Sequence, residues 1–312
     1  MTDRLLQAAL AHWGFADAQP RLIAQRENAV YRVETPDGPV ALRLHRPGLR
    51  SEAELWSELQ WMKMLARNRL MVPAPIAASD GSLLLTMNGT MIDVLTWLDG
   101  TPMGRDGALS DLPDPAAGYA ALGQIMARMH DLADDWTLPP GFRRPAWDGA
   151  GLVGDAPLWG RFWENPELSA AQALLLIRAR DYARGAFDRA YAKADYGLIH
   201  ADLVPENVLL HGDGPRVIDF DDGGFGYRLF DLATAANRAE RADPTGSLRD
   251  ALVKSYGTHR PVDPAALALF QALRSFTYVG WIVPRMDEAG AGPRCARFIA
   301  DACLRASALL DS

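Results

Sequence analysis

The alternation of hydrophobic and polar residues over the first hundred positions predicts a strand-rich region. Apolar and polar side chains alternate over 28–35 and again over 40–45, the period of half-buried strands. Two more strands are expected at 83–87 and 90–98, because Asn88-Gly89 between them is a strong hairpin signal. Short strands joined by tight turns indicate an antiparallel sheet.

Helical spacing appears twice within this region. Over 51–68 the apolar residues recur every three or four positions, which gives a helix one buried face. Glu54 follows Ser51 by three residues, the spacing of a capping box at a helix start. Residues 1–13 also have amphipathic helix spacing, and charged residues replace the uninterrupted apolar segment of a signal peptide.

The pattern changes to helices after about residue 100. A segment rich in Trp, Pro and Gly at 134–166 is expected to be a loop. The helices are expected over 115–132, 169–193, 228–240, 245–256, 264–278 and 293–310. The chain is therefore predicted to be an α+β protein of two lobes. A β-rich domain with one main helix is expected at 1–98, and a mainly helical domain at 99–312.

Composition and charge narrow the classes of function. The 312 residues carry a formal charge of −7, and no basic stripe of the kind that binds nucleic acid is present. No stretch reaches the roughly 18 apolar residues that span a membrane. Cys295 and Cys303 lie about 12 Å apart along a predicted helix, which is too far for a disulfide. We therefore expect a cytoplasmic protein with neither nucleic acid nor membrane as a partner.

The residues that carry chemistry lie between 199 and 232. Asp202 ends the run His200-Ala201-Asp202, Asn207 follows five residues later, and Asp219 comes twelve residues after that, in Ile-Asp-Phe-Asp-Asp. Packed acidic groups cost free energy unless a cation neutralises them, and magnesium takes carboxylate and other oxygen ligands with substrate phosphates. We expect Asn207 and Asp219 to hold Mg²⁺ and Asp202 to accept a hydroxyl proton. The alternative is a solvated acidic hairpin.

These residues resemble the catalytic loop and metal-binding motif of the aminoglycoside phosphotransferase, choline kinase and homoserine kinase-like family. Members are relatives of protein kinases, whose loop reads H-R-D-x-x-x-x-N before a later D-F-G. Ala201 takes the place of the arginine, and Asp221 takes that of the glycine. The resemblance implies a bilobal protein-kinase-like fold and ATP- and Mg²⁺-dependent phosphate transfer to a hydroxyl. It implies Asp202 as the catalytic residue, with Asn207, Asp219 and Asp221 at the metal.

The first lobe carries the family's nucleotide-binding pattern in altered form. The run 27–33 resembles the family's first hairpin, and Asn28 lies in the loop expected to cover the phosphates, which lacks the pattern G-x-G-x-x-G. Arg43 replaces the lysine that contacts the α- and β-phosphates. The glutamate expected to pair with Arg43 is Glu58, with Glu54 as the alternative.

Further positions follow from the same resemblance. Val94, Leu95 and Thr96 fall where the hinge between the lobes binds adenine. Asp231 resembles an aspartate at the start of a helix of the second lobe, and we expect it to bond backbone groups of the catalytic loop. His200 is expected to be a packed, hydrogen-bonded anchor.

The motifs leave the phosphate acceptor open. The resemblance implies a small-molecule hydroxyl substrate of the amino-alcohol, homoserine-like or aminoglycoside type, and an acidic site suits a cationic amine. Similarity to the bacterial stress-response branch leaves a protein serine or threonine as an alternative. Arg43 and the glycine-free loop keep open a function of another class, a non-catalytic pseudokinase.

Overall fold

The computed structural model describes residues 2–25, 28–105, 107–189, 195–212 and 214–311 and divides into two compact units. The first unit consists of Met1–Thr101, Asp135–Arg144 and Leu209–Asp221. The second consists of Pro102–Asp134, Pro145–Val208 and Asp222–Ser312. The first unit therefore takes in two later segments besides the residues of the predicted domain 1–98.

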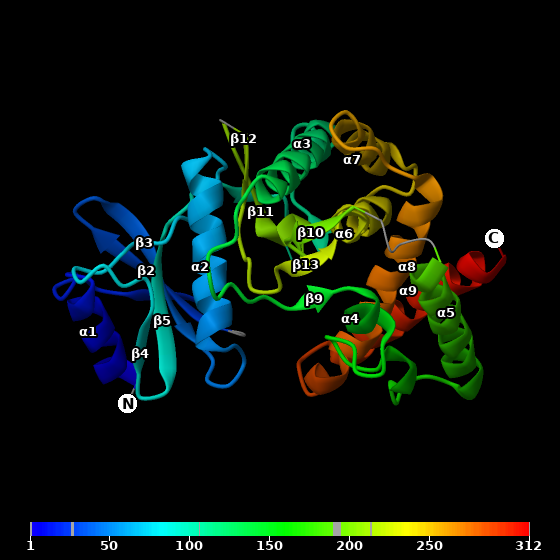
Figure 1. Cartoon of the computed structure of the whole chain (residues 1–312), viewed down its shortest axis with the longest axis horizontal. Coiled ribbons are helices and arrows are strands. Elements are labelled where there is room, and N and C mark those ends of the chain that lie inside the picture. Colours follow the sequence, from blue (N-terminus) through cyan, green and yellow to red (C-terminus); the bar gives the residue numbers. More distant parts are fainter. Residues whose placement is uncertain (1, 26–27, 106, 190–194, 213, 312) are drawn as a thin grey trace. The chain divides into compact units, whose positions relative to one another are not determined.

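The first unit is built on a five-stranded antiparallel sheet with the order β1-β2-β3-β5-β4 (Figure 1). Its strands are β1 (Arg21–Gln25), β2 (Asn28–Thr35), β3 (Gly38–His45), β4 (Leu85–Met87) and β5 (Thr90–Thr96). The expected hairpin is confirmed: it turns at Asn88 and Gly89, whose φ values of 52° and 77° suit these two residue types. Residue 27, the first of the motif 27–33, lies outside the described residues.

Two helices cover opposite faces of this sheet. Side chains alternate along β3, so Val40 and Leu42 join a buried cluster with α1 (Thr2–His12), while Arg43 bonds a residue of α2 (Glu52–Arg67). The α2 helix begins at the expected capping box, in which Ser51 and Glu54 bond each other's backbone N–H. Both expected helices are confirmed.

The second unit is mainly helical. The expected helices are confirmed as α3 (Pro115–Asp134), α5 (Ala170–Arg189), α6 (Arg228–Ala242), α7 (Ser247–Gly257), α8 (Pro264–Trp281) and α9 (Ala291–Asp311). Residues 190–194 at the end of the expected helix 169–193 lie outside the described residues. Helix α3 packs on α7, and both α6 and α9 pack on α8. Gly123 permits the first contact, because a Cβ there would lie 2.5 Å from the carbonyl of Leu252.

Two sequence predictions in this region were wrong. The segment 134–166, expected to be a loop, contains short regular elements. A strand was also missed: β13 (Gly224–Tyr227) lies between β10 (Tyr196–Ile199) and β9 (Ala146–Trp147) in a three-stranded sheet. That strand, β13, carries Gly226, and a Cβ there would lie 2.4 Å from the Ile199 side chain. Glycine is rare in strands, so the close approach that requires it also hid the strand.

The remaining elements are short. The strands are β6 (Thr101–Pro102), β7 (Gly104–Arg105), β8 (Ala108–Leu109), β9 (Ala146–Trp147), β10 (Tyr196–Ile199), β11 (Val208–His211), β12 (Gly214–Val217) and β13 (Gly224–Tyr227). The helices are α4 (Gly149–Val153) and the 3₁₀ turns η1 (Phe162–Glu164), η2 (Pro205–Asn207) and η3 (Val283–Arg285). Strand β12 ends before Asp219, whose φ of 68° does not belong to a strand.

Cys295 and Cys303 are free thiols, as the spacing predicts, and Cys295 is buried. Within the part of the chain that the structure describes, no helix combines the length and apolarity needed to cross a bilayer.

Candidate functional site

The second unit holds the expected catalytic loop in a strained turn. Ala201 has a φ of 65°, in the left-handed region that costs an L-residue about 1–2 kcal/mol. The Asp231 carboxylate accepts hydrogen bonds from the backbone N–H groups of His200, at 2.8 Å, and Ala201, at 2.6 Å. Asp231 therefore holds the loop through its backbone, as expected. His200 is fully buried, the position expected of an anchor.

Asp202 follows this turn with its carboxylate held at both oxygens. The Asn207 carboxamide donates to the Asp202 backbone carbonyl at 2.9 Å and to Oδ2 at 3.0 Å. Arg274 Nη2 donates to Oδ1 at 2.6 Å. The Asp202 side chain keeps 25% of its surface exposed, so an acceptor can reach it. Asn207 uses both amide hydrogens in these bonds, and its carbonyl oxygen is the atom that can meet a cation.

Asp231 is also hydrogen-bonded to a buried pair of side chains, His130 and Tyr256. His130 Nε2 lies 3.0 Å from the Asp231 carboxylate, and Nδ1 lies 3.0 Å from the hydroxyl of Tyr256. A neutral imidazole satisfies both contacts, donating to the carboxylate and accepting from the hydroxyl. Burial lowers the pKa of His130, although the bond to Asp231 acts in the opposite sense. Burial alone would raise the pKa of Asp231, but the contacts with His130 and His200 together outweigh burial and lower that pKa.

Acidification is expected to destabilise the protein through His130. Because its pKa is lower in the folded protein than in the unfolded chain, the unfolded chain binds more protons as the pH falls below about 6.5. The stability that neutral His130 provides is present above that pH and is lost below it. The free energy of unfolding, measured from pH 7 to pH 5, should therefore fall more steeply for wild type than for His130→Gln. His259→Gln, at an exposed histidine of the same unit, should retain the wild-type slope. Equal slopes for wild type and His130→Gln would contradict this assignment.

Half-buried aromatic side chains pack around Arg274, the residue that bonds the Asp202 carboxylate. The Arg274 guanidinium lies 4.3 Å from the Tyr278 ring centre and 4.6 Å from that of Trp159. The centres of the Trp281 and Trp159 rings are 6.1 Å apart. Cation–π attraction to Tyr278 and Trp159 therefore adds to the contacts that hold Arg274 in place.

The first unit contains a buried charged network around Arg43. Its guanidinium donates to both oxygens of Asp93, each at 2.8 Å, and to Glu58 at 2.9 Å. Burial alone would lower the pKa of Arg43, but the attraction of Asp93 and Glu58 raises it well above its ordinary value. The expected pairing of Arg43 with Glu58 is confirmed, and Glu54 is engaged in the capping box instead.

Asp221 and Asn28 belong to the same network. The Asp221 carboxylate accepts from Arg43 at 3.4 Å and from the Asn28 carboxamide. Burial and the charge of Glu58 raise the pKa of Asp221. Four bonds to carboxylates occupy most of the five N–H groups of Arg43. The phosphate contact of Arg43, the part of Asn28 in covering phosphates and the metal contact of Asp221 therefore stay predictions.

The expected adenine-binding residues lie within β5. Val94 and Leu95 are buried in the sheet. The Val94 carbonyl accepts from the N–H of Ile76 at 2.8 Å, and the Thr96 N–H donates to the carbonyl of Ala74 at 2.8 Å. These backbone groups are therefore hydrogen-bonded to other residues of the first unit. Adenine binding at Val94, Leu95 and Thr96 stays a prediction.

The expected metal ligands Asp219 and Asn207 both carry side-chain oxygen atoms. Asp219 is exposed at its strained position, and Asn207 presents a carbonyl oxygen. Over the described ranges, no three His, Cys, Asp or Glu side chains are grouped so that they could hold a metal ion. Magnesium commonly binds through one or two carboxylates plus substrate phosphates. A carboxylate such as that of Asp219 and a carbonyl oxygen such as that of Asn207 fit this kind of binding.

Three polar residues of these networks were not predicted from the sequence. Arg144 donates to Glu58 at 3.1 Å and to the carbonyl of Phe220 at 2.7 Å. Arg274 and His130 are charged or titratable residues on buried helix faces, and such a residue at a position with core spacing is a signal that could have identified them. Arg144 lies in the Trp-, Pro- and Gly-rich segment, where the pattern holds no such signal.

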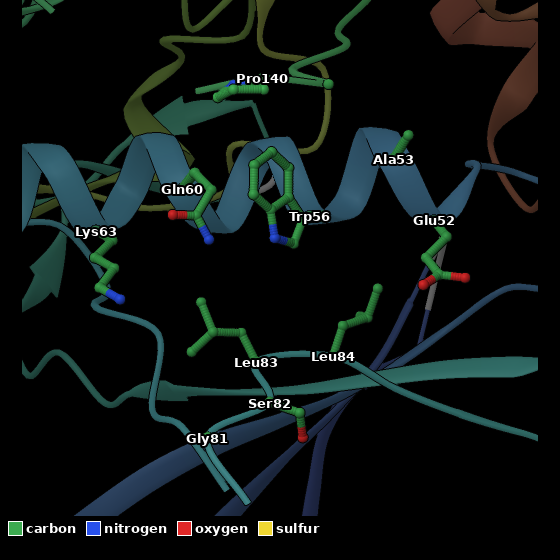
Figure 2. Close-up of a pocket in the computed structure, with 11 residues that line it drawn as sticks. Glu52, Ala53, Trp56, Gln60, Lys63, Gly81, Ser82, Leu83, Leu84 and Pro140 are labelled. Carbon is green, nitrogen blue, oxygen red and sulfur yellow. The ribbon is translucent and has the colours of Figure 1, made fainter. Parts of the chain in front are cut away.

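A separate pocket of about 680 Å³ lies on another face of α2 (Figure 2). In the close-up, Trp56, Gln60 and Lys63 of α2 face Leu83 and Leu84 across the pocket. Its other lining residues are Glu52, Ala53, Gly81, Ser82, Pro140 and Gly141. None of the predicted site residues is among them.

Comparisons with known proteins agree with this geometry. Residues 20–270 match the model of the phosphotransferase enzyme family. A homoserine kinase of Paraburkholderia phymatum is 28% identical over 272 residues, 82% of this chain and 78% of that protein. The structure of a microcompartment-associated aminopropanol kinase is 29% identical, with a TM-score of 0.84 over 99% of this chain and 98% of that one. An amicoumacin kinase, solved with AMP-PNP and Ca²⁺, has a TM-score of 0.77 at 19% identity, over 97% of this chain and 93% of that one. The predicted protein-kinase-like α+β fold is confirmed.

Proposed function

Because this chain belongs to the phosphotransferase enzyme family, kinases that phosphorylate hydroxyl groups of small molecules, we propose that it transfers phosphate from ATP to a small amino alcohol. The observation that carries the proposal is the Asp202 carboxylate, partly exposed and held at both oxygens by Asn207 and Arg274. A pseudokinase has no need of such an ordered base.

Asp202 supplies the base of the reaction. Its carboxylate orients the acceptor hydroxyl and accepts the proton, while the hydroxyl oxygen forms a bond to the terminal phosphorus of ATP. The bond from that phosphorus to the bridging oxygen breaks, and ADP leaves with the electron pair. Positioning and neutralisation of charge supply most of the rate in reactions of this class.

The nucleotide and its metal ion engage residues of both sequence motifs. Asn207 and Asp219 hold a magnesium ion in this proposal, with Asp221 as a further ligand, and a bound ion would neutralise charge on the phosphates. Arg43, oriented by Glu58, offers its remaining N–H to the α- and β-phosphates. Asn28, the first residue of β2, borders the phosphates in this proposal, and Val94, Leu95 and Thr96 border adenine.

An amine on the acceptor suits the surroundings of Asp202. The Asp202 carboxylate is partly exposed, and a carboxylate attracts a cationic group. The likeness to the aminopropanol kinase over nearly the whole of both chains supports the same acceptor class.

Homoserine is the second candidate. It adds a carboxylate to the amine and the hydroxyl, and homoserine kinases are among the similar proteins. Arg285, whose guanidinium lies 4.2 Å from the Trp281 ring centre, is a cation at the edge of the aromatic group around Arg274 that could meet that carboxylate.

The test is ATP consumption with magnesium against a panel of acceptors. 1-Amino-2-propanol, ethanolamine, choline, homoserine, amicoumacin and a generic protein substrate are compared by kcat/KM. The highest value for a carboxylate-free amino alcohol supports the proposal. The highest value for homoserine selects the second candidate, and transfer to protein alone would overturn both.

A further inference from the structure

Arg274 stands in the middle of α8 and reaches the catalytic loop from the interior. Its Nη2 donates to Oδ1 of Asp202 at 2.6 Å and to the hydroxyl of Tyr278 at 2.8 Å. Its Nη1 donates to the backbone carbonyl of Ala201 at 3.1 Å. One guanidinium therefore holds both the Asp202 side chain and the peptide that precedes it.

Burial and charge make this a strong contact. The Arg274 side chain is 0% exposed, whereas Asp202 is 25% exposed. Burial alone would lower the pKa of Arg274, but the charges of Tyr278 and Asp202 raise it, so the guanidinium stays charged. Hydrogen bonds between charged partners are shorter and stronger than neutral ones. Arg274 thus holds Asp202 from within and leaves part of the carboxylate accessible.

The contacts on the two oxygens restrict the orientation of the carboxylate. Arg274 bonds Oδ1 and Asn207 bonds Oδ2, so rotation about the Cβ–Cγ bond breaks at least one of these bonds. The strained residue Ala201 is likewise held at both ends. Its N–H donates to Asp231 and its carbonyl accepts from Arg274.

We propose that Arg274 is a positioning residue that fixes the Asp202 carboxylate for proton acceptance, an inference that rests on the proposed function. A general base works only within hydrogen-bond reach of its proton, and a displacement of about 1 Å can cost about 100-fold in rate. We expect Arg274→Ala to lower kcat about 10- to 100-fold. The KM values for ATP and acceptor should change much less, because the Arg274 side chain is fully buried and bonds the loop from the interior.

The experiment pairs Arg274→Ala with Arg180→Ala. Arg180 of α5 lies 3.9 Å from the Trp163 ring centre and donates to the Val153 carbonyl at 2.8 Å, so it also combines aromatic and backbone contacts. Both variants are assayed with and without millimolar guanidinium chloride, with sodium chloride at equal ionic strength as the reference. Folded protein is quantified by circular dichroism. Arg274→Lys, which keeps the charge and loses the planar fork, replaces Arg274→Ala if the latter does not fold.

A loss of kcat in Arg274→Ala that guanidinium restores, with Arg180→Ala unaffected, supports the proposal. For Arg274→Lys the supporting result is a partial loss of kcat at unchanged KM. Unchanged kcat in the folded variant, or a loss that follows only the folded fraction, overturns it. If wild type phosphorylates no acceptor, the proposed function fails separately. Arg274 is then judged by crystal structures of wild type and variant: a rotated Asp202 carboxylate supports positioning, and an unchanged loop overturns it.

Discussion

Asp202→Asn is expected to lower kcat by about 10² to 10⁴, the usual contribution of a positioned general base. Asparagine has the shape of aspartate, and its carbonyl oxygen can still accept the bond from Arg274. It cannot take up a proton at neutral pH, so the acceptor hydroxyl loses its base. Steady-state kinetics of phosphate transfer, together with nucleotide binding by calorimetry, measure the two effects separately.

The matched control is Asp155→Asn in the same unit. Asp155 also pairs with an arginine, at 2.7 Å from Arg180, but its side chain is 83% exposed. This variant should retain wild-type kcat, and both variants should bind ATP with wild-type affinity. A kcat for Asp202→Asn within threefold of wild type would remove Asp202 from the chemistry and favour the pseudokinase.

Local patterns predicted most of the fold because they depend on residues close together in the chain. The capping box at Ser51 and the Asn88-Gly89 turn each involve only a few consecutive positions, and the structure forms both. Strand β13 was not predicted because its glycines are explained only by neighbouring residues: Gly226 pairs with Gly197, and a Cβ on Gly226 would meet the Ile199 side chain. Tertiary packing overrides local propensity at such positions.

The same contrast holds for the candidate site. Asp202 and Asn207 lie five residues apart and could be read as one motif, and their hydrogen bond forms. Arg274 lies 72 residues from Asp202. No period or spacing in the sequence connects them, because the packing of α8 on the loop brings them together. Asp202 and Asn207, the residues of the proposed reaction, were therefore predictable from the sequence, and Arg274, which holds Asp202 in position, was not.

The ion pair between Arg43 and Asp93 could be predicted only if the order of the strands in the sheet were known. They face each other in the register of β3 and β5, two strands that are not consecutive in the chain. From the sequence, Arg43 was predicted to contact phosphates, and no spacing in the sequence identified Asp93 as its partner. Only the pairing of β3 with β5 shows that the two charges neutralise each other inside the sheet.

Asp93→Asn is consequently expected to destabilise the protein by about 3–5 kcal/mol, the usual effect of removing one partner of a buried ion pair. Asp93 is fully buried, accepts two bonds from Arg43 and lies 2.7 Å from His45 Nε2. Burial alone would raise the pKa of Asp93, but Arg43 and His45 lower it far below its ordinary value, so the group is charged at neutral pH. The neutral amide leaves the buried Arg43 guanidinium with less compensating charge.

The comparison that isolates burial is Glu34→Gln, in β2 of the same sheet. Glu34 pairs with Arg32 at 2.7 Å, but its side chain is 69% exposed, and exposed pairs contribute about 0–1 kcal/mol. Urea denaturation at pH 7, followed by circular dichroism, should therefore give a large loss for Asp93→Asn and almost none for Glu34→Gln. Similar small losses for both would mean that the network around Arg43 is stabilised by Glu58 and Asp221 without Asp93. A large loss confined to Asp93→Asn would instead identify the pairing of β3 with β5 as the part of the network on which this sheet depends, because Asp93 is the partner that only that pairing supplies.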